Sequence, residues 1–396
     1  MQENEVIYLD NAATTQMRKE VLDEMLPYFV ESYGNASSIY SLGRKNKAVL
    51  DEKRAQIANI LGAKDREIFF TSGGSEADNW AIKGVMFANR AKGNHIITTK
   101  IEHHAILHTC EYLEKNGFEV TYLPVDENGL VSLKDLENAI RPTTVLITVM
   151  FANNEIGTIE PIKEIGEIAR KHKIYFHTDA VQAVGHLPIN VQDLNIDLLS
   201  FSGHKFNGPK GVGALYIRSG VKIDSLIHGG AQERGKRATT ENIAGIVGMA
   251  KALELATKDM EKDNKRILEL REYLINGIFE RIPHVILNGD RQKRLPSNVN
   301  FSIKYIEGES LLLMLDMMGI CASSGSACTS GSLDPSHVLL AIGLPHETAH
   351  GSLRLSLGKD TKKEEIDKVL EVLPNIVKRL RDMSPLYDKV EKEGGK

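Results

Sequence analysis

LLSFSGHKFNGPKG, residues 198 to 211, joins an apolar run to a glycine-rich turn, and Lys205 stands at the junction between them. Similar apolar runs lie on both sides of this stretch, and longer helical patterns separate them. Such alternation is typical of βαβ units and of a mostly parallel sheet. We therefore expect an α/β fold over residues 65–220, with functional side chains at the carboxyl ends of its strands.

The alternation predicts seven strands in this region. They are Glu67–Thr71, His95–Lys100, Val120–Pro124, Thr144–Met150, Ile174–Thr178, Leu198–Ser202 and Val212–Arg218. Ser75–Ala91 and Pro161–Lys173 are predicted to be connecting helices, and the second has Pro in its first turn and basic residues at its end.

The C-terminal part has a different pattern. Ala244–Ile282 is predicted to form one long, charged, amphipathic helix that leads to a second unit. An α+β mixture is expected after it, with strands at Ser297–Ile303 and near Arg354–Ser356 and helices at Glu309–Met318 and from Lys363. A chain of 396 residues suits two domains at ~100–200 residues each.

Composition excludes several classes of protein. Hydrophobic residues make up 42% and charged residues 26%, a balance typical of globular proteins. The 49 basic and 53 acidic side chains give a net charge of −4, which disfavours nucleic-acid binding. The sequence has no apolar stretch long enough to span a bilayer. We expect no signal peptide, because the first residues are acidic and polar and lack a basic region followed by an apolar one. Three cysteines make no disulfide framework, so we expect a cytoplasmic protein.

A lysine and an aspartate follow two consecutive predicted strands. Lys205 comes after Leu198–Ser202, and Asp179 comes after Ile174–Thr178. Pyridoxal phosphate requires such a pair, because a lysine forms its imine and a carboxylate keeps its ring nitrogen protonated. A surface lysine and a helix-capping aspartate are the ordinary explanations of each residue alone. They account poorly for the two together.

Two further strand ends carry polar groups. Thr71-Ser72-Gly73-Gly74-Ser75-Glu76 leads into a predicted helix, whose N-terminal N–H groups suit a cofactor phosphate. It lacks the spacing of a Walker A or G-x-G-x-x-G motif, and an ordinary turn is the alternative. His103 follows another strand, where an imidazole can stack on a flat ring and transfer protons. No C-x-x-C or H-E-x-x-H motif accompanies it, so we expect no intrinsic metal site. Asn154 is placed to reach a ring hydroxyl.

Cys328 lies in a run of small residues, SSGSACTSG, which begins at Ser323. Such a run cannot pack a core, so it predicts an exposed loop. A thiolate nucleophile needs this kind of access. Cys110 lies in a helical pattern and Cys321 in a strand pattern, and both are predicted to behave as small hydrophobes.

Together these segments resemble the cysteine desulfurases of the NifS/IscS type, within the class V aminotransferases of PLP fold type I. The resemblance runs from Tyr8-Leu9-Asp10-Asn11-Ala12-Ala13 to Arg354-Leu355-Ser356, and SSGSACTSG is its most specific part. It implies a homodimer, a large cofactor domain at 16–254, and a small α+β domain formed by 1–15 and 255–396 that carries the cysteine loop.

The resemblance also implies roles for individual residues. Lys205 corresponds to the Schiff-base lysine, and His103 corresponds to the stacked, proton-transferring histidine. The other implied cofactor contacts are Gly74, Ser75, Asn154, Asp179, Gln182, Ser202 and His204, with Thr240 reaching the partner subunit's phosphate. Arg354 and Asn35 are implied to bind substrate. Cys328 is the implied persulfide carrier and a transient ligand of an iron–sulfur species.

The activity expected from this resemblance is conversion of L-cysteine to L-alanine. The sulfur would pass as a persulfide to an iron–sulfur scaffold protein or to tRNA thiolation, without direct contact with nucleic acid or membrane. A class V aminotransferase or a selenocysteine lyase is the alternative on the same fold. A non-catalytic sulfur-relay protein is a second alternative, against which Lys205 and Asp179 argue.

Overall fold

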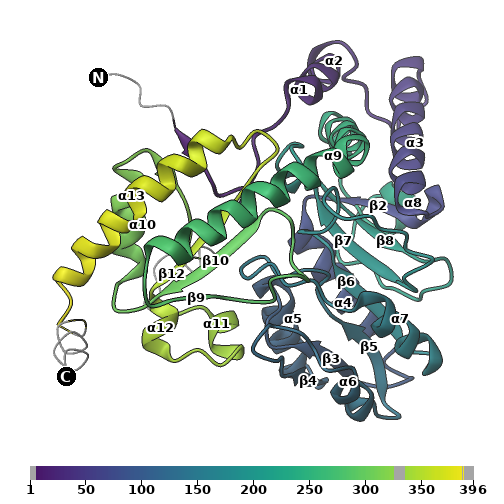
Figure 1. Cartoon of the computed structure of the whole chain (residues 1–396). Helices are drawn as coiled ribbons and strands as arrows, with labels where there is room; N and C mark the ends of the chain where they lie inside the picture. Colours follow the sequence, from purple (N-terminus) through teal and green to yellow (C-terminus); the bar gives the residue numbers. More distant parts are fainter. Residues whose placement is uncertain (1–5, 325–334, 386, 388–396) are drawn as a thin grey trace.

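The computed structural model describes residues 6–324, 335–385 and 387 (Figure 1). Its largest sheet has seven strands in the order β2-β8-β7-β6-β5-β3-β4. They are β2 (Ile68–Thr71), β8 (Gly213–Ile217), β7 (Leu198–Ser202), β6 (Tyr175–Asp179), β5 (Thr144–Thr148), β3 (His95–Thr99) and β4 (Glu119–Leu123). Strand β8 runs antiparallel to both of its neighbours, and the other pairs are parallel. The expected mostly parallel α/β sheet is confirmed.

Helices cover both faces of this sheet because its strands are apolar on both sides. Ile96 and Ile97 are neighbours on β3, yet they belong to separate hydrophobic cores on opposite faces. The helices of this part are α1 (Lys19–Met25), α2 (Pro27–Val30), α3 (Ser41–Leu61), α4 (Gly74–Ala88), α5 (His104–Glu114), α6 (Leu133–Ala139), α7 (Ile162–Lys171) and α8 (Gln232–Gly235). The first three were not predicted from the sequence.

The second part of the chain is built on a three-stranded antiparallel sheet in the order β12-β10-β9. Its strands are β9 (Val285–Leu287), β10 (Asn298–Ile303) and β12 (Ser352–Ser356), with β1 (Ile7–Tyr8) and β11 (Ile320–Cys321) forming a parallel pair beside it. Its helices are α10 (Gly308–Asp316), α11 (His337–Ala341), α12 (His346–His350) and α13 (Lys363–Asp382). The expected α+β unit is confirmed.

One long helix, α9 (Ile243–Arg281), connects the two parts and crosses the middle of the molecule in Figure 1. Its first buried residues, up to Leu253, pack in the core of the large sheet. From Ile267 onward its buried residues join the core of the smaller sheet, where α13 also packs. The predicted boundary between residues 254 and 255 falls inside this helix and stays a prediction.

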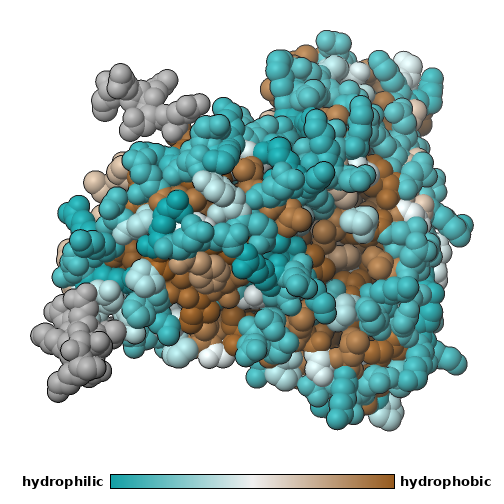
Figure 2. All heavy atoms as spheres, in the orientation of Figure 1, coloured by the Kyte–Doolittle hydropathy of each residue, from teal (hydrophilic) through white to brown (hydrophobic). Residues whose placement is uncertain are grey.

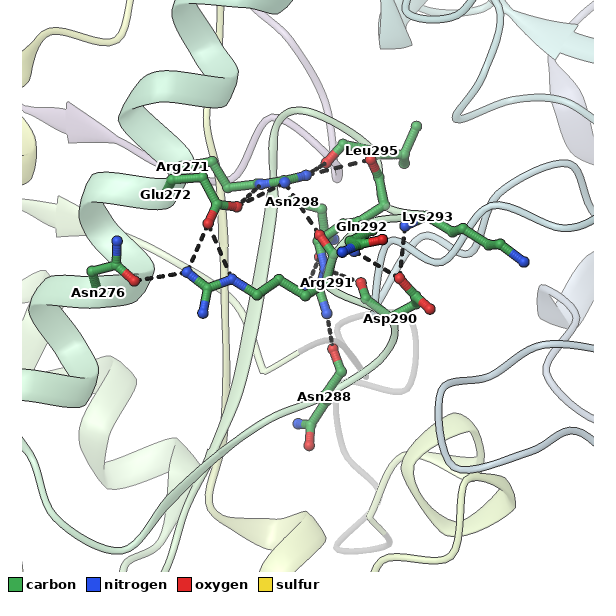
Figure 3. Close-up of polar contacts among 11 residues, drawn as sticks. Arg271, Glu272, Asn276, Asn288, Asp290, Arg291, Gln292, Lys293, Leu295 and Asn298 are labelled. Atoms are coloured by element: carbon green, nitrogen blue, oxygen red, sulfur yellow. Dashed lines mark hydrogen bonds and ion pairs between the residues drawn. The ribbon is translucent and has the colours of Figure 1, made fainter.

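The loop between β9 and β10 ties α9 to the turn that follows β5, and Figure 3 shows its contacts with α9. In this loop Arg291 donates to Glu272 on α9 over 2.7 Å, and the buried Arg271 of the same helix donates to the carbonyl oxygen of Leu295 over 3.1 Å. At the end of the loop, the Nδ2 of Asn298 donates to the carbonyl oxygen of Glu155 over 3.0 Å. The turn at Asn153–Glu155 is therefore held by both parts of the molecule.

Hydrophilic side chains cover the outer helices on the face shown in Figure 2, and hydrophobic ones gather toward its middle. Large apolar side chains are also exposed in and just after α2, among them Phe29, Val30 and Tyr33. Within the described residues, no helix combines the length and apolar character that a membrane crossing needs.

Candidate active site

A cavity of about 350 Å³ lies at the carboxyl ends of β6 and β7. Ten of the residues predicted to be functional line it, namely Gly74, Ser75, His103, Asn154, Asp179, Gln182, Ser202, His204, Lys205 and Arg354. The structure thus brings together residues that are up to 280 positions apart. Those of the large sheet meet because its parallel strands end at the same edge, and Arg354 reaches the cavity from β12 of the smaller sheet.

Asp179 is the last residue of β6 and is 6% exposed. Its Oδ1 accepts a hydrogen bond from the N–H of Val181 over 2.9 Å. Burial raises the pKa of Asp179 to about 6, while the Val181 N–H and the charge of Lys205 oppose this rise. A cationic group against this carboxylate would favour its ionised form.

Lys205 ends the short 3₁₀ turn Gly203–Lys205, directly after β7. Its Nζ donates to the carbonyl oxygens of Ala12 and Ala13, over 2.7 and 2.8 Å. Gln182 donates to the same Ala12 carbonyl oxygen over 3.0 Å. The N-terminal segment therefore forms one wall of the cavity and contacts the predicted cofactor lysine directly.

His103 caps the N-terminus of α5, where its Nδ1 accepts from the N–H of Ala105 over 3.1 Å. Burial, and then the nearby charge of Lys205, lower the pKa of His103 to about 4. The ring is therefore neutral at neutral pH. Because Nδ1 accepts, the neutral ring has its proton on Nε2.

The first turn of α4 supplies the predicted phosphate cradle. A Cβ at Gly74 would lie 2.6 Å from the Cγ2 of Val181, so the close packing here requires glycine. Glu76 in the same turn accepts from the N–H of Ser72 and pairs with Arg237 over 2.7 Å. These contacts tie the N-terminus of α4 to the residue after β2 and to the segment after α8.

Arg354 lies on β12 and is 3% exposed. Its Nη1 donates to the carbonyl oxygen of Asn154 over 2.9 Å, and its Nη2 donates to Oδ1 of Asp10 over 2.8 Å. A buried guanidinium in the wall of a cavity can bind a carboxylate with high directionality.

Three of the predicted site residues are not placed in this cavity. Asn35 is exposed, and its Oδ1 accepts from the N–H of Ser37. Thr240 is exposed and lines a separate cavity of about 140 Å³ with Ser72 and Arg237. Cys328 lies outside the described residues.

The other two cysteines have the predicted character. Cys110 is fully buried in α5, and burial raises the pKa of its thiol. Cys321 on β11 is half-buried, and burial raises the pKa of its thiol also. Within the described residues, no group of three His, Cys, Asp or Glu side chains is arranged to hold a metal ion.

Two buried acids near the cavity were not identified from the sequence. Asp78 lines the cavity from α4, and burial together with the charge of Asp179 raises its pKa well above the ordinary value. Glu102 precedes His103, and burial raises its pKa to about 8. The only sequence signal was that both are acidic residues next to residues already singled out.

Comparison with known proteins places this arrangement in a family. The family model of the class-V aminotransferases matches residues 7–369. Cysteine desulfurase IscS of Clostridium botulinum is 65% identical over 387 residues, which is 97% of this chain and 98% of that protein. The chain belongs to the cysteine desulfurases of the class-V aminotransferase family.

Solved structures of the family have the same fold. A NifS-like protein superposes with a TM-score of 0.90 at 39% identity, covering 95% of this chain and 100% of that one. The structure described as SspA in complex with cysteine gives a TM-score of 0.79 at 40% identity, covering 89% and 98%. The desulfurase family depends on pyridoxal phosphate, so the cavity is the candidate site for that cofactor.

Proposed function

We propose that this chain uses pyridoxal phosphate to convert L-cysteine to L-alanine and captures the sulfur as a persulfide on Cys328. One observation carries the proposal. Lys205 and Asp179 follow adjacent strands and line one cavity, with the guanidinium of Arg354 in its wall. The named relatives are cysteine desulfurases, and one related structure is described as a complex with cysteine.

The donor set suits this cofactor. The amine of Lys205 is the group that attaches it, and the buried carboxylate of Asp179 would keep its ring nitrogen protonated. The N-terminus of α4 at Gly74 and Ser75 offers backbone N–H groups to the phosphate, next to Ser202 and His204. Asn154 and Gln182 line the same cavity and have amides for the ring hydroxyl.

When bound, the cofactor supplies an electron sink for bonds broken at the substrate's Cα and Cβ. Arg354 would bind the substrate carboxylate and so fix the orientation of Cα. Lys205 would move the proton at Cα, and the carbonyl oxygens of Ala12 and Ala13 would hold its ammonium group whenever it is protonated. His103 is neutral and can donate the proton on its Nε2.

The sulfur step needs no external oxidant. The bond between Cβ and sulfur of L-cysteine breaks, and the sulfur joins Sγ of Cys328. Cβ then takes a proton and becomes the methyl group of L-alanine. The two thiols thus yield one methyl group and one persulfide, and the sulfur is then passed to an iron–sulfur scaffold protein or to a tRNA-thiolation acceptor. A thiol carrier requires a reducing compartment, so we place this chemistry in the cytoplasm.

A homodimer belongs to the same proposal. Phe29, Val30 and Tyr33 expose 58%, 73% and 72% of their surfaces, and such an apolar group favours an interface. Thr240 would complete the phosphate site of the partner subunit, since its exposed hydroxyl does not line the cavity of its own chain.

The test compares two variants that remove separate steps. Lys205→Ala should lose the yellow absorbance of the attached cofactor and all alanine release. Cys328→Ala should keep that absorbance and bind cysteine, but it should form no persulfide. Persulfide mapped to Cys110 or Cys321 in the unmodified protein would contradict the assignment of Cys328. Amino-group transfer by Cys328→Ala at the normal rate would favour an aminotransferase instead.

A further inference from the structure

The contacts of Arg354 leave one of its donors without a partner. Nη1 is held by the carbonyl oxygen of Asn154, and Nη2 is held by the carboxylate of Asp10. The Nε of Arg354 is buried and has no hydrogen-bond partner among the described residues. Arg354 lines the cavity, so a ligand there can contact this side chain.

Asp10 is held in place by the same strand that carries Arg354. It forms a parallel bridge with Ser356 on β12, and the N–H of Ser356 donates to the carbonyl oxygen of Leu9 over 2.7 Å. The hydroxyl of Tyr8 donates to the carbonyl oxygens of Asp10 and Thr14, over 3.1 and 2.8 Å. The backbone of Asp10 is therefore fixed against the strand of its ion-pair partner.

We propose that Asp10 is a positioning residue that orients Arg354 for the carboxylate of the amino-acid substrate. Asp10 accepts a hydrogen bond from Nη2 and the carbonyl oxygen of Asn154 accepts one from Nη1. The planar group and its remaining N–H groups are therefore held in one orientation. The substrate carboxylate then binds a guanidinium that is already ordered, and it does not have to restrict the rotamers of a long side chain itself.

Asp10 also balances charge. A buried arginine without a counter-ion is costly when no substrate is present, and the carboxylate 2.8 Å away offsets that cost. Arg354 lines the cavity and Asp10 does not. The residue thus acts through Arg354 and does not touch the substrate.

This inference rests on the proposed function, in which Arg354 binds the substrate carboxylate. The experiment therefore uses two amines that differ only by that group, L-alanine and ethylamine. The absorbance change of the bound cofactor reports their binding to the holoenzyme of each variant. Arg354→Gln should weaken L-alanine binding and leave ethylamine binding unchanged.

Asp10→Ala should raise the Kd for L-alanine about tenfold, the loss expected when a charge-assisted contact no longer orders the anchor. Its ethylamine Kd should not change. Asp10→Asn keeps an oxygen that accepts from Nη2, so it should restore most of the L-alanine affinity. For L-cysteine turnover, Asp10→Ala should raise KM far more than it lowers kcat.

Asp23→Ala is the matched control, because it removes an exposed acid paired with Lys19 on α1, and it should bind both amines normally. Thermal unfolding of each holoenzyme shows that the variants are folded. If Arg354→Gln weakens L-alanine binding but Asp10→Ala does not, the role of Asp10 is wrong and that of Arg354 stands. Equal weakening of ethylamine by Asp10→Ala would also overturn the proposal. Unchanged L-alanine binding in Arg354→Gln would refute the carboxylate anchor itself.

Discussion

Glu102 is a fully buried carboxyl group on the loop that leads to His103. Its Oε1 accepts from the hydroxyl of Thr99 over 2.7 Å and from the N–H of Met150 over 3.0 Å. Its Oε2 has no partner among the described residues. Burial raises the pKa of Glu102 to about 8, and the charges of Asp179 and Glu160 add to this rise. At neutral pH the group is therefore mostly a neutral acid.

Glu102→Gln should change how stability depends on pH. Between the ordinary pKa of 4.5 and about 8, the native protein holds a proton that the unfolded chain has released, so stability falls as pH rises. Glutamine cannot titrate. Relative to the unmodified protein, the free energy of unfolding of the variant should therefore rise by on the order of 3 kcal/mol between pH 5 and pH 8. Urea unfolding of the apoprotein measures this difference. The exposed Glu111→Gln on α5 is the control and should show no such gain.

The individual site residues show which part of a site can be predicted from sequence. Lys205, Asp179 and His103 follow predicted strands, and strand ends converge in a parallel sheet, so their meeting could be predicted. Asp78 lies in the first turns of α4, where an acidic residue is ordinary on any exposed helix. Only its burial distinguishes it, and burial depends on strands far away in the sequence.

Among the elements, α3 depends on a buried ion pair. Arg54 of α3 makes a two-pronged contact with Glu233 of α8, with both distances at 2.7 Å. Glu233 also accepts from the N–H of Phe70 on β2 over 2.9 Å. The pair therefore fixes α3 to the edge of the large sheet and to the segment that leads to Thr240.

Arg54→Met should destabilise the protein by about 3–5 kcal/mol, because it leaves the carboxylate of Glu233 buried without its partner. Adding Glu233→Gln should recover a large part of that loss. Arg141→Met removes an exposed pair with Glu119 and should cost only ~0–1 kcal/mol. Urea unfolding of the four proteins measures these differences. Equal costs for Arg54→Met and Arg141→Met would contradict the role given to the buried pair.

The sequence of α3 explains why this helix was not predicted. Asn46 and Arg54 occupy its buried face, so the apolar periodicity of an amphipathic helix is interrupted there. The strands of the large sheet were predicted to within about two residues because each is a short run rich in β-branched, aromatic or other apolar residues. The antiparallel direction of β8 could not be predicted, since a strand buried on both faces has the same pattern in either direction.

At the scale of the whole molecule, the proposed dimer makes Thr240 a residue of the partner's site. Thr240→Val should weaken cofactor retention without unfolding the protein, because the side chain is exposed within its own chain. Mixing inactive Lys205→Ala with inactive Thr240→Val should give heterodimers in which one site joins native Lys205 to native Thr240. That site should regain alanine release. An active monomer by light scattering, or no rescue in verified heterodimers, would refute the shared site.

The N-terminal segment that places Ala12 and Ala13 in the cavity wall has a consequence for biosynthesis. Asp10 is synthesised long before β12, so Asp10 and Arg354 can pair only after β12 has been made. At roughly 5–20 residues per second, on the order of 10 s of translation separates Lys205 from Arg354. All strands of the large sheet are therefore synthesised well before Arg354, the proposed carboxylate anchor. In the proposed function, selectivity for a carboxylate is therefore acquired only when Asp10 meets β12.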